Sequence, residues 1–70
     1  MLKQRRKELN MTLKEMSQKI GLKYNTLSQY ENNIQFPHAT IIMDVAKAYE
    51  LSDEEIIIWL KEINKIKKQG

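Results

Sequence analysis

The sequence predicts an all-α domain of five helices, and three observations support this prediction. Only two glycines and one proline interrupt the 70 residues. Almost every segment places its apolar residues at helical spacing rather than in alternation. Two Ser/Thr-x-x-Glu patterns, Thr12 with Glu15 and Ser52 with Glu55, mark helix starts at which paired side chains satisfy free backbone donors.

The first three helices occupy the amino-terminal half. The first is expected over about Leu2 to Leu9, and it carries Arg6 on its apolar face, where the guanidinium needs a partner. The second follows Thr12 as N-cap and ends at Gly21, which can adopt the left-handed conformation that closes a helix. The third is expected over about Tyr24 to Glu31.

A loop and two further helices complete the chain. The loop is expected over Asn32 to His38, because Pro37 excludes a continuous helix before it. The fourth helix is expected over about Ala39 to Tyr49, and the fifth begins after Ser52 and covers residues 53–67.

Size and composition exclude several classes of function. Seventy residues make a single domain, residues 1–70, which leaves no room for a large enzyme cavity. Cysteine is absent and His38 is the single histidine, so neither a disulfide framework nor a Cys/His zinc site can be built, and His38 is expected to be a surface residue near the start of the fourth helix rather than a ligand or a base. We therefore expect a protein that is not an enzyme, with no catalytic residue, metal, cofactor or small-molecule substrate.

Charge is distributed unevenly along the chain, whose formal net charge is +3. Residues 1–38 carry seven basic and three acidic side chains, residues 39–60 carry one and five, and residues 61–70 carry four and one. This pattern predicts a positive side that suits nucleic acid and an acidic patch that faces away from it. No run of about 18 apolar residues and no signal-peptide pattern occurs, so we expect a cytoplasmic protein without a membrane partner.

The spacing of apolar residues in the segment 12–32 is that of a helix-turn-helix. Counting from Leu13 as position 1, apolar side chains fall at positions 4, 8, 10, 15 and 18, and Gly21 stands at position 9. Two helices that cross through a tight turn need contacts at these positions. Ser17 stands at position 5, where alanine is usual. The alternative is an ordinary two-helix corner of a bundle.

The residues Thr12-Leu-Lys-Glu-Met-Ser-Gln-Lys-Ile-Gly21 and Thr26-Leu-Ser-Gln-Tyr-Glu31, followed by Pro37, resemble the phage-repressor/Cro type of helix-turn-helix regulator, the xenobiotic-response-element family. The resemblance covers about Leu2 to Ser52. It implies a five-helix lambda-repressor-like fold, dimeric DNA binding and transcriptional control, usually repression. It also implies an ion pair between Arg6 and Glu31.

Three residues depart from the family pattern. Lys23 stands where a Ser or Thr usually caps the recognition helix, Asn33 replaces the usual loop glycine, and Glu50 stands where a small residue or Gly often follows the fourth helix. Asn33 tolerates a left-handed backbone. The positive charge of Lys23 interacts unfavourably with the dipole at the amino end of the third helix, so a lysine there suits a position next to a phosphate or a weak cap.

The polar face of the third helix supplies the candidate base contacts. Asn25, Ser28 and Gln29 fall within about 100° of one another on a helical wheel, opposite Leu27 and Tyr30. Asn and Gln amides can bond bidentately to adenine. The expected base-reading residues are Tyr24, Asn25, Ser28 and Gln29. The alternative is a solvated polar face.

Phosphate contacts are expected from helix amino termini and from short polar or basic side chains. The expected residues are Thr12, Leu13, Lys23, Thr26, Asn32, Asn33 and Arg5, with Lys7 as an addition. For each of them the alternative is a solvated surface position.

The fifth helix is apolar over a wider arc than one core needs. Ile56, Ile57, Trp59, Leu60, Ile63 and Ile66 cover about 180° of the wheel, and Ile58 falls among charged residues. We expect a two-fold dimer through this helix that presents two recognition helices to half-sites about 34 Å apart. The expected interface residues are Ile57, Ile58, Trp59 and Ile63. The alternative is that Trp59 and its neighbours complete the core.

These patterns together predict a sequence-specific regulator, most simply a repressor, that binds double-stranded DNA as a homodimer on a near-palindromic operator. The alternative is a protein-interaction adaptor on the same scaffold, such as an antirepressor or antitoxin component that uses the apolar last helix. A DNA-binding fragment of a longer regulator is a third interpretation.

Overall fold

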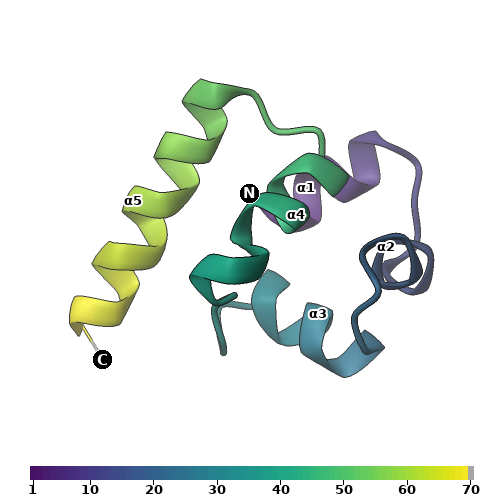
Figure 1. The fold of residues 1–70 in the computed structure, drawn as a ribbon, viewed down its shortest axis with the longest axis horizontal. Coiled ribbons are helices and arrows are strands. Elements are labelled where there is room, and N and C mark those ends of the chain that lie inside the picture. The colour runs from purple at the N-terminus through teal and green to yellow at the C-terminus, as the bar shows by residue number, and fades with distance from the viewer. Residues whose placement is uncertain (70) are drawn as a thin grey trace.

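Five helices make up the fold (Figure 1), and the part of the chain that the structure describes contains no strand. The computed structural model describes residues 1–69, and side chains for residues 1–66. Gly70, which the expected domain includes, and the side chains of Lys67 and Lys68 in its basic tail lie outside this description. The helices are α1 Leu2–Glu8, α2 Leu13–Ile20, α3 Tyr24–Glu31, α4 Ala39–Ala48 and α5 Asp53–Gln69. The all-α prediction is confirmed.

The ends of α2 have the capping chemistry that the sequence predicts. The Glu15 amide donates to Thr12 Oγ1 at 3.1 Å, and the Thr12 amide donates to Glu15 Oε1 at 2.9 Å. At the other end Gly21 has φ +86°, and its amide donates to the Ser17 carbonyl at 2.9 Å. A Cβ on Gly21 would meet no atom within 4 Å, so backbone conformation rather than space favours glycine there.

A second capping box opens α5. The Glu55 amide donates to Ser52 Oγ at 3.2 Å, and the Ser52 amide donates to Glu55 Oε1 at 2.9 Å. The helix then extends two residues beyond the expected end at residue 67, to Gln69.

Among the residues that the structure describes, three other than glycine have a positive φ: Asn10 at +57°, Asn33 at +60° and Glu50 at +54°. Asn33 and Glu50 occupy two of the positions at which the sequence departs from the family pattern. Asparagine visits this region readily, whereas glutamate does so at a cost of about 1 kcal/mol. The Glu50 carbonyl accepts a hydrogen bond from Arg5 Nη1 at 2.7 Å, which helps to hold this turn.

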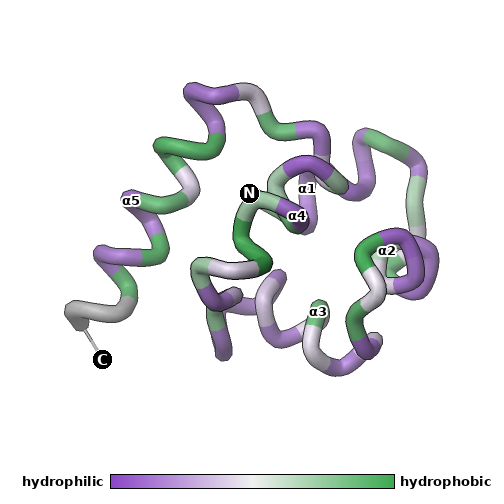
Figure 2. The backbone as a smooth tube through the Cα atoms, in the orientation of Figure 1, coloured by the Kyte–Doolittle hydropathy of each residue, from purple (hydrophilic) through white to green (hydrophobic). Residues whose placement is uncertain are grey.

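The core lies between α1, α2, α3 and α4, with α5 laid along one side (Figure 1). Figure 2 shows hydrophobic and hydrophilic residues alternating along the helices, as expected when each helix has one buried face. No described helix is both long and apolar enough to cross a membrane. The buried apolar residues are Leu2, Met16, Leu27, Tyr30, Val45, Ala46, Ala48, Tyr49, Trp59 and Ile63.

A buried polar network joins α1, α3 and α4. Arg6 Nε and Nη2 donate to the two carboxylate oxygens of Glu31 at 2.8 and 3.1 Å, which is the ion pair that the family resemblance implies. Arg6 Nη1 also donates to the Met11 carbonyl at 3.0 Å, and Tyr49 Oη donates to Glu31 Oε2 at 2.6 Å. Burial, together with the Glu31 carboxylate, raises the pKa of Tyr49, which therefore remains a hydrogen-bond donor.

Removing one member of this network should destabilise the fold strongly. The Glu31 side chain is only 3% exposed, so Arg6→Ala leaves a buried carboxylate without its cation and should lower the free energy of unfolding by about 3–5 kcal/mol. Tyr49→Phe removes a single hydrogen bond and should cost about 1–2 kcal/mol. Urea unfolding measures both, with Lys7→Ala on the exposed side of α1 as the control. Equal losses for Arg6→Ala and Lys7→Ala would contradict the structural role of the pair.

The two capping boxes should make stability depend on pH. Hydrogen bonds from Thr12 lower the pKa of Glu15, and hydrogen bonding from the Ser52 backbone, aided by Arg5, lowers the pKa of Glu55. The two ionised carboxylates therefore contribute to the free energy of unfolding above the ordinary pKa of 4.5, and this contribution is lost as the pH falls through their lowered pKa values. Between about pH 6 and pH 3, a Glu15→Gln, Glu55→Gln variant should therefore lose less thermal stability than the parent. Identical pH dependence of the two melting temperatures would refute this.

Candidate nucleic-acid interface

One face of α3 points away from the buried side chains of the helix and carries the four side chains predicted to read bases. Leu27 and Tyr30 are 0% and 7% exposed and fix the buried face of the helix. On the opposite side Tyr24 and Asn25 are exposed, and Ser28 and Gln29 are half-buried. The structure therefore brings Tyr24, Asn25, Ser28 and Gln29 together on one polar arc.

The turn between α2 and α3 is close enough to bury Ser17. This side chain is 3% exposed, and its hydroxyl donates to the Lys14 carbonyl at 2.8 Å. Because the acceptor also lies in α2, the buried hydroxyl of Ser17 has a hydrogen-bond partner without help from another helix, at a position where alanine is usual. The departure from alanine therefore leaves no buried polar atom without a partner.

The first turn of α2 retains amide groups that can bind an anion. The capping box uses the Glu15 amide and one acceptor site of the Thr12 hydroxyl. The amides of Leu13 and Lys14 lie in the first turn of the helix, where no carbonyl of the same helix can accept from them, so they are available to a phosphate oxygen. The hydroxyl hydrogen of Thr12 is also available.

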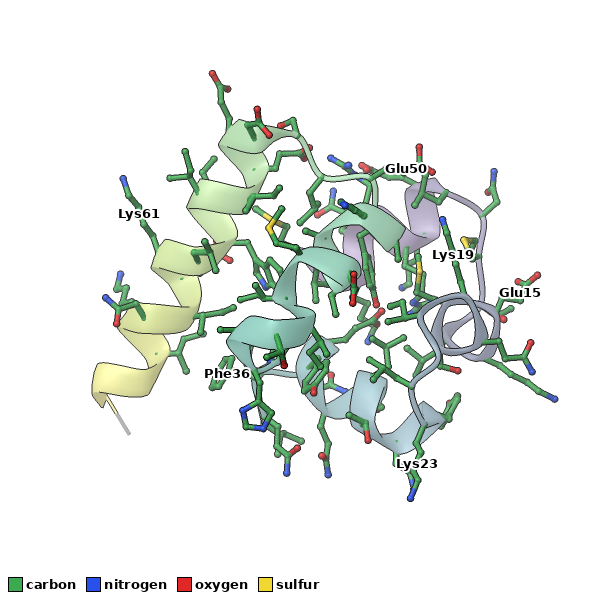
Figure 3. All side chains as sticks on the ribbon, viewed as in Figure 1. Glu15, Lys19, Lys23, Phe36, Glu50 and Lys61 are labelled. Atoms are coloured by element: carbon green, nitrogen blue, oxygen red, sulfur yellow. The ribbon has the colours of Figure 1, made fainter. Side chains whose placement is uncertain are left out.

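The start of α3 has no side-chain cap. Lys23 is the N-cap residue, with φ −70° and ψ 144°, and its side chain makes no capping hydrogen bond. Figure 3 shows Lys23 at the start of α3, pointing away from the domain. Its ammonium and the first amides of α3, among them that of Thr26, are placed to meet a phosphate.

The two asparagines after α3 have different surroundings. Asn32 Nδ2 donates to the Ser28 carbonyl at 2.8 Å and lies 3.4 Å from Ser28 Oγ, so this side chain caps the end of α3. Its donor is therefore already engaged, which does not favour the phosphate contact expected of Asn32. Asn33 is exposed.

Arg5 has a different place from the one expected. Its Nη1 donates to the carbonyls of Glu50 and Tyr49 at 2.7 and 3.3 Å, its Nε pairs with Glu8 at 3.2 Å, and its Nη2 pairs with Glu55. The guanidinium thus joins α1 to the end of α4 and the start of α5, and it is not available to a phosphate. The Arg5 to Glu55 pair spans 50 residues of sequence, and no local pattern indicates it.

The interface residues expected on α5 divide into two groups. Trp59 and Ile63 are 5% and 8% exposed and belong to the core of the single chain, so their assignment to a dimer interface is wrong. The alternative, that Trp59 completes the core, agrees with the structure. Ile57 and Ile58 are 53% and 49% exposed and remain available to a partner.

The acidic residues that begin α5 lie away from the polar arc of α3. Asp53 and Glu54 are exposed at the amino end of α5, which lies at the opposite edge of the domain from α3 (Figure 1). Within the described residues, no group of three or more His, Cys, Asp or Glu side chains is placed to hold a metal ion. The polar arc of α3 thus carries neutral side chains beside Lys23, and the one carboxylate of α3, that of Glu31, is buried in its pair with Arg6.

The geometry agrees with a comparison of the sequence with known families. Residues 2–56 match the family model described as helix-turn-helix. The matched range begins with α1 and ends in the first turn of α5. Neither curated proteins nor solved structures gave a match to this chain.

Proposed function

The chain belongs to the Cro/C1-type helix-turn-helix family, whose members bind DNA, and we propose that it is a transcriptional regulator that places α3 in the major groove of its operator. The observation that carries this proposal is the polar arc of α3, which faces away from the core and begins at a helix amino terminus that has no side-chain cap. Such termini position a protein on the phosphate backbone, while side chains on the arc reach base edges.

The side chains on the arc favour hydrogen-bond readout. Asn25 and Gln29 each present a donor and an acceptor, which suits bidentate bonding to the N6 and N7 atoms of adenine. Ser28 can bond to either kind of base edge, and Tyr24 can pack on a thymine methyl or a sugar. Leu13, Lys23, Thr26 and Asn33 then contact phosphates, together with the hydroxyl of Thr12.

Two copies on adjacent half-sites form the functional unit in this proposal. One recognition helix reaches only a few base pairs, so a near-palindromic operator with half-sites about 34 Å apart supplies the specificity that a regulator needs. Binding that covers a promoter represses transcription, and this regulatory role follows from the resemblance to repressors. The proposal places the protein in the cytoplasm and gives it no catalytic activity.

A second candidate function is that of a protein-interaction adaptor, such as an antirepressor or antitoxin component. The exposed Ile57 and Ile58 favour it, because they offer an apolar surface that the core does not use. Such an adaptor would form a stable complex with another protein, and it would not be retained on DNA.

Selection from a pool of random duplexes tests the main proposal. The purified protein should enrich a common motif with two related half-sites at moderate salt, and sequencing of the bound DNA would show it. Recovery of DNA with no shared motif would contradict sequence-specific binding.

Substitutions on α3 separate base contacts from phosphate contacts. Asn25→Ala or Gln29→Ala should cost about 1–3 kcal/mol of binding free energy on the selected duplex and relax the preference at one base position. Lys23→Ala should weaken selected and random duplexes alike and reduce the salt dependence of binding. Fluorescence anisotropy with both duplexes over a range of salt measures these effects. Losses of the same size on both duplexes for all three variants would mean that α3 does not read the groove.

A further inference from the structure

The residues that follow α3 form a Schellman motif, a hydrogen-bonded turn that ends a helix. Asn32 is the C-cap residue, and Asn33 follows it with φ +60°. The Ile34 amide donates to the Gln29 carbonyl at 2.9 Å, and the Asn33 amide donates to the Tyr30 carbonyl at 3.4 Å. The backbone of Ile34 is therefore held against the last turn of α3.

The side chain of Ile34 has no apolar partner on α3. An apolar residue at this position of the motif usually packs on the third or fourth residue from the end of its own helix. In α3 these residues are Gln29 and Ser28, and both belong to the polar arc. Ile34 lies outside the core and is 67% exposed, more than any other large apolar side chain among the described residues.

A single exposed isoleucine is ordinary on a small protein, but the place of this one is not. In the proposed function Gln29 contacts a base and Asn33 contacts a phosphate. Ile34 lies beside the first and directly follows the second, so its side chain lies between the base edges and the backbone. Figure 1 shows the loop after α3 at the same lower edge of the domain as α3 itself. Ile34 therefore extends the surface that enters the groove.

The chemistry of the major groove identifies what an isoleucine can contact there. The base edges present hydrogen-bond donors and acceptors, which an aliphatic side chain cannot use, and one apolar group, the C5 methyl of thymine. The side chain is β-branched, and its backbone is already fixed by the turn. It therefore loses little conformational freedom when a methyl group covers it.

We infer that Ile34 reads the 5-methyl group of a pyrimidine next to the base pair that Gln29 contacts. This inference rests on the proposed function, because it requires α3 to lie in the major groove. It adds to hydrogen-bond readout by the polar arc a base contact from outside the recognition helix. Thymine and 5-methylcytosine carry the same methyl group at the same place, so both bases offer the contact.

Deoxyuridine tests the contact, because it removes the methyl group of thymidine and leaves the hydrogen bonds of the base pair in place. The thymines of one selected half-site are replaced one at a time. The parent chain should lose about fourfold in affinity at one position, the loss expected for one buried methyl group. Fluorescence anisotropy with each duplex measures the affinities.

Variants of Ile34 assign that loss to its side chain. Ile34→Ala should bind the duplex with deoxyuridine at that position as tightly as the selected duplex. Ile34→Val keeps a branched apolar side chain and should keep most of the difference. A second sensitive position that persists in Ile34→Ala belongs to another residue, such as Tyr24, and does not count for Ile34.

Cytosine at the sensitive position separates the two possible sources of the methyl group. The parent chain should bind 5-methylcytosine about fourfold more tightly than cytosine, and Ile34→Ala should bind the two alike. A gain from both thymine and 5-methylcytosine identifies the methyl group itself as the determinant. A gain from thymine alone confines the contact to the T:A pair and still supports it.

The control removes an exposed apolar side chain elsewhere. Met43 on α4 is 47% exposed and makes no contact in the proposed function, so Met43→Ala should respond to deoxyuridine as the parent does. Circular dichroism of each variant checks that the helices are intact.

Three results would overturn the inference. The first is an equal response of the parent and of Ile34→Ala to deoxyuridine at every thymine. The second is a loss of the same size for Ile34→Ala on selected and random duplexes, which would indicate packing on the sugar-phosphate backbone. The third is unchanged DNA binding by Ile34→Ala, which would leave the isoleucine to a protein partner. Failure to select any common motif contradicts the proposed function instead, so the two failures are distinct.

Discussion

The buried carboxylate of Glu31 is the group on which the arrangement of the first four helices depends. It accepts hydrogen bonds from Arg6 on α1 and from Tyr49 at the end of α4, and Arg6 also holds the Met11 carbonyl ahead of α2. A carboxylate that is 3% exposed is tolerated only while these donors stay in place. The direction of α3 is therefore set by several helices together, and α3 carries all of the expected base contacts.

Features that depend on neighbouring residues could be predicted from the sequence. The capping boxes at Thr12 and Ser52, the helix end at Gly21 and the bounds of α3 are confirmed, because each is decided by side chains within four residues. Neighbouring residues do not identify the partner of Arg6, since the helical wheel shows only that the guanidinium needs a partner. The family resemblance supplied Glu31.

Contacts between distant residues could not be predicted in this way. Arg5 binds the turn between α4 and α5, where the backbone of Glu50 is left-handed and the carbonyls of Tyr49 and Glu50 accept hydrogen bonds from the guanidinium. No local sequence pattern reveals this contact. On α5 the wheel gives the width of the apolar arc without showing which part meets the core. The structure assigns Trp59 and Ile63 to the inside and leaves Ile57 outside, only two residues from Trp59.

The division of α3 into a buried face and an open one has a consequence for how such a protein can diversify. Leu27, Tyr30 and Glu31 hold the helix in place, while Tyr24 and Asn25 take no part in the core. Exchanges at surface positions of this kind usually change stability by less than about 0.5 kcal/mol. For the proposed function, this means that a few substitutions at such positions would redirect the domain to a new operator with little effect on the stability of the fold.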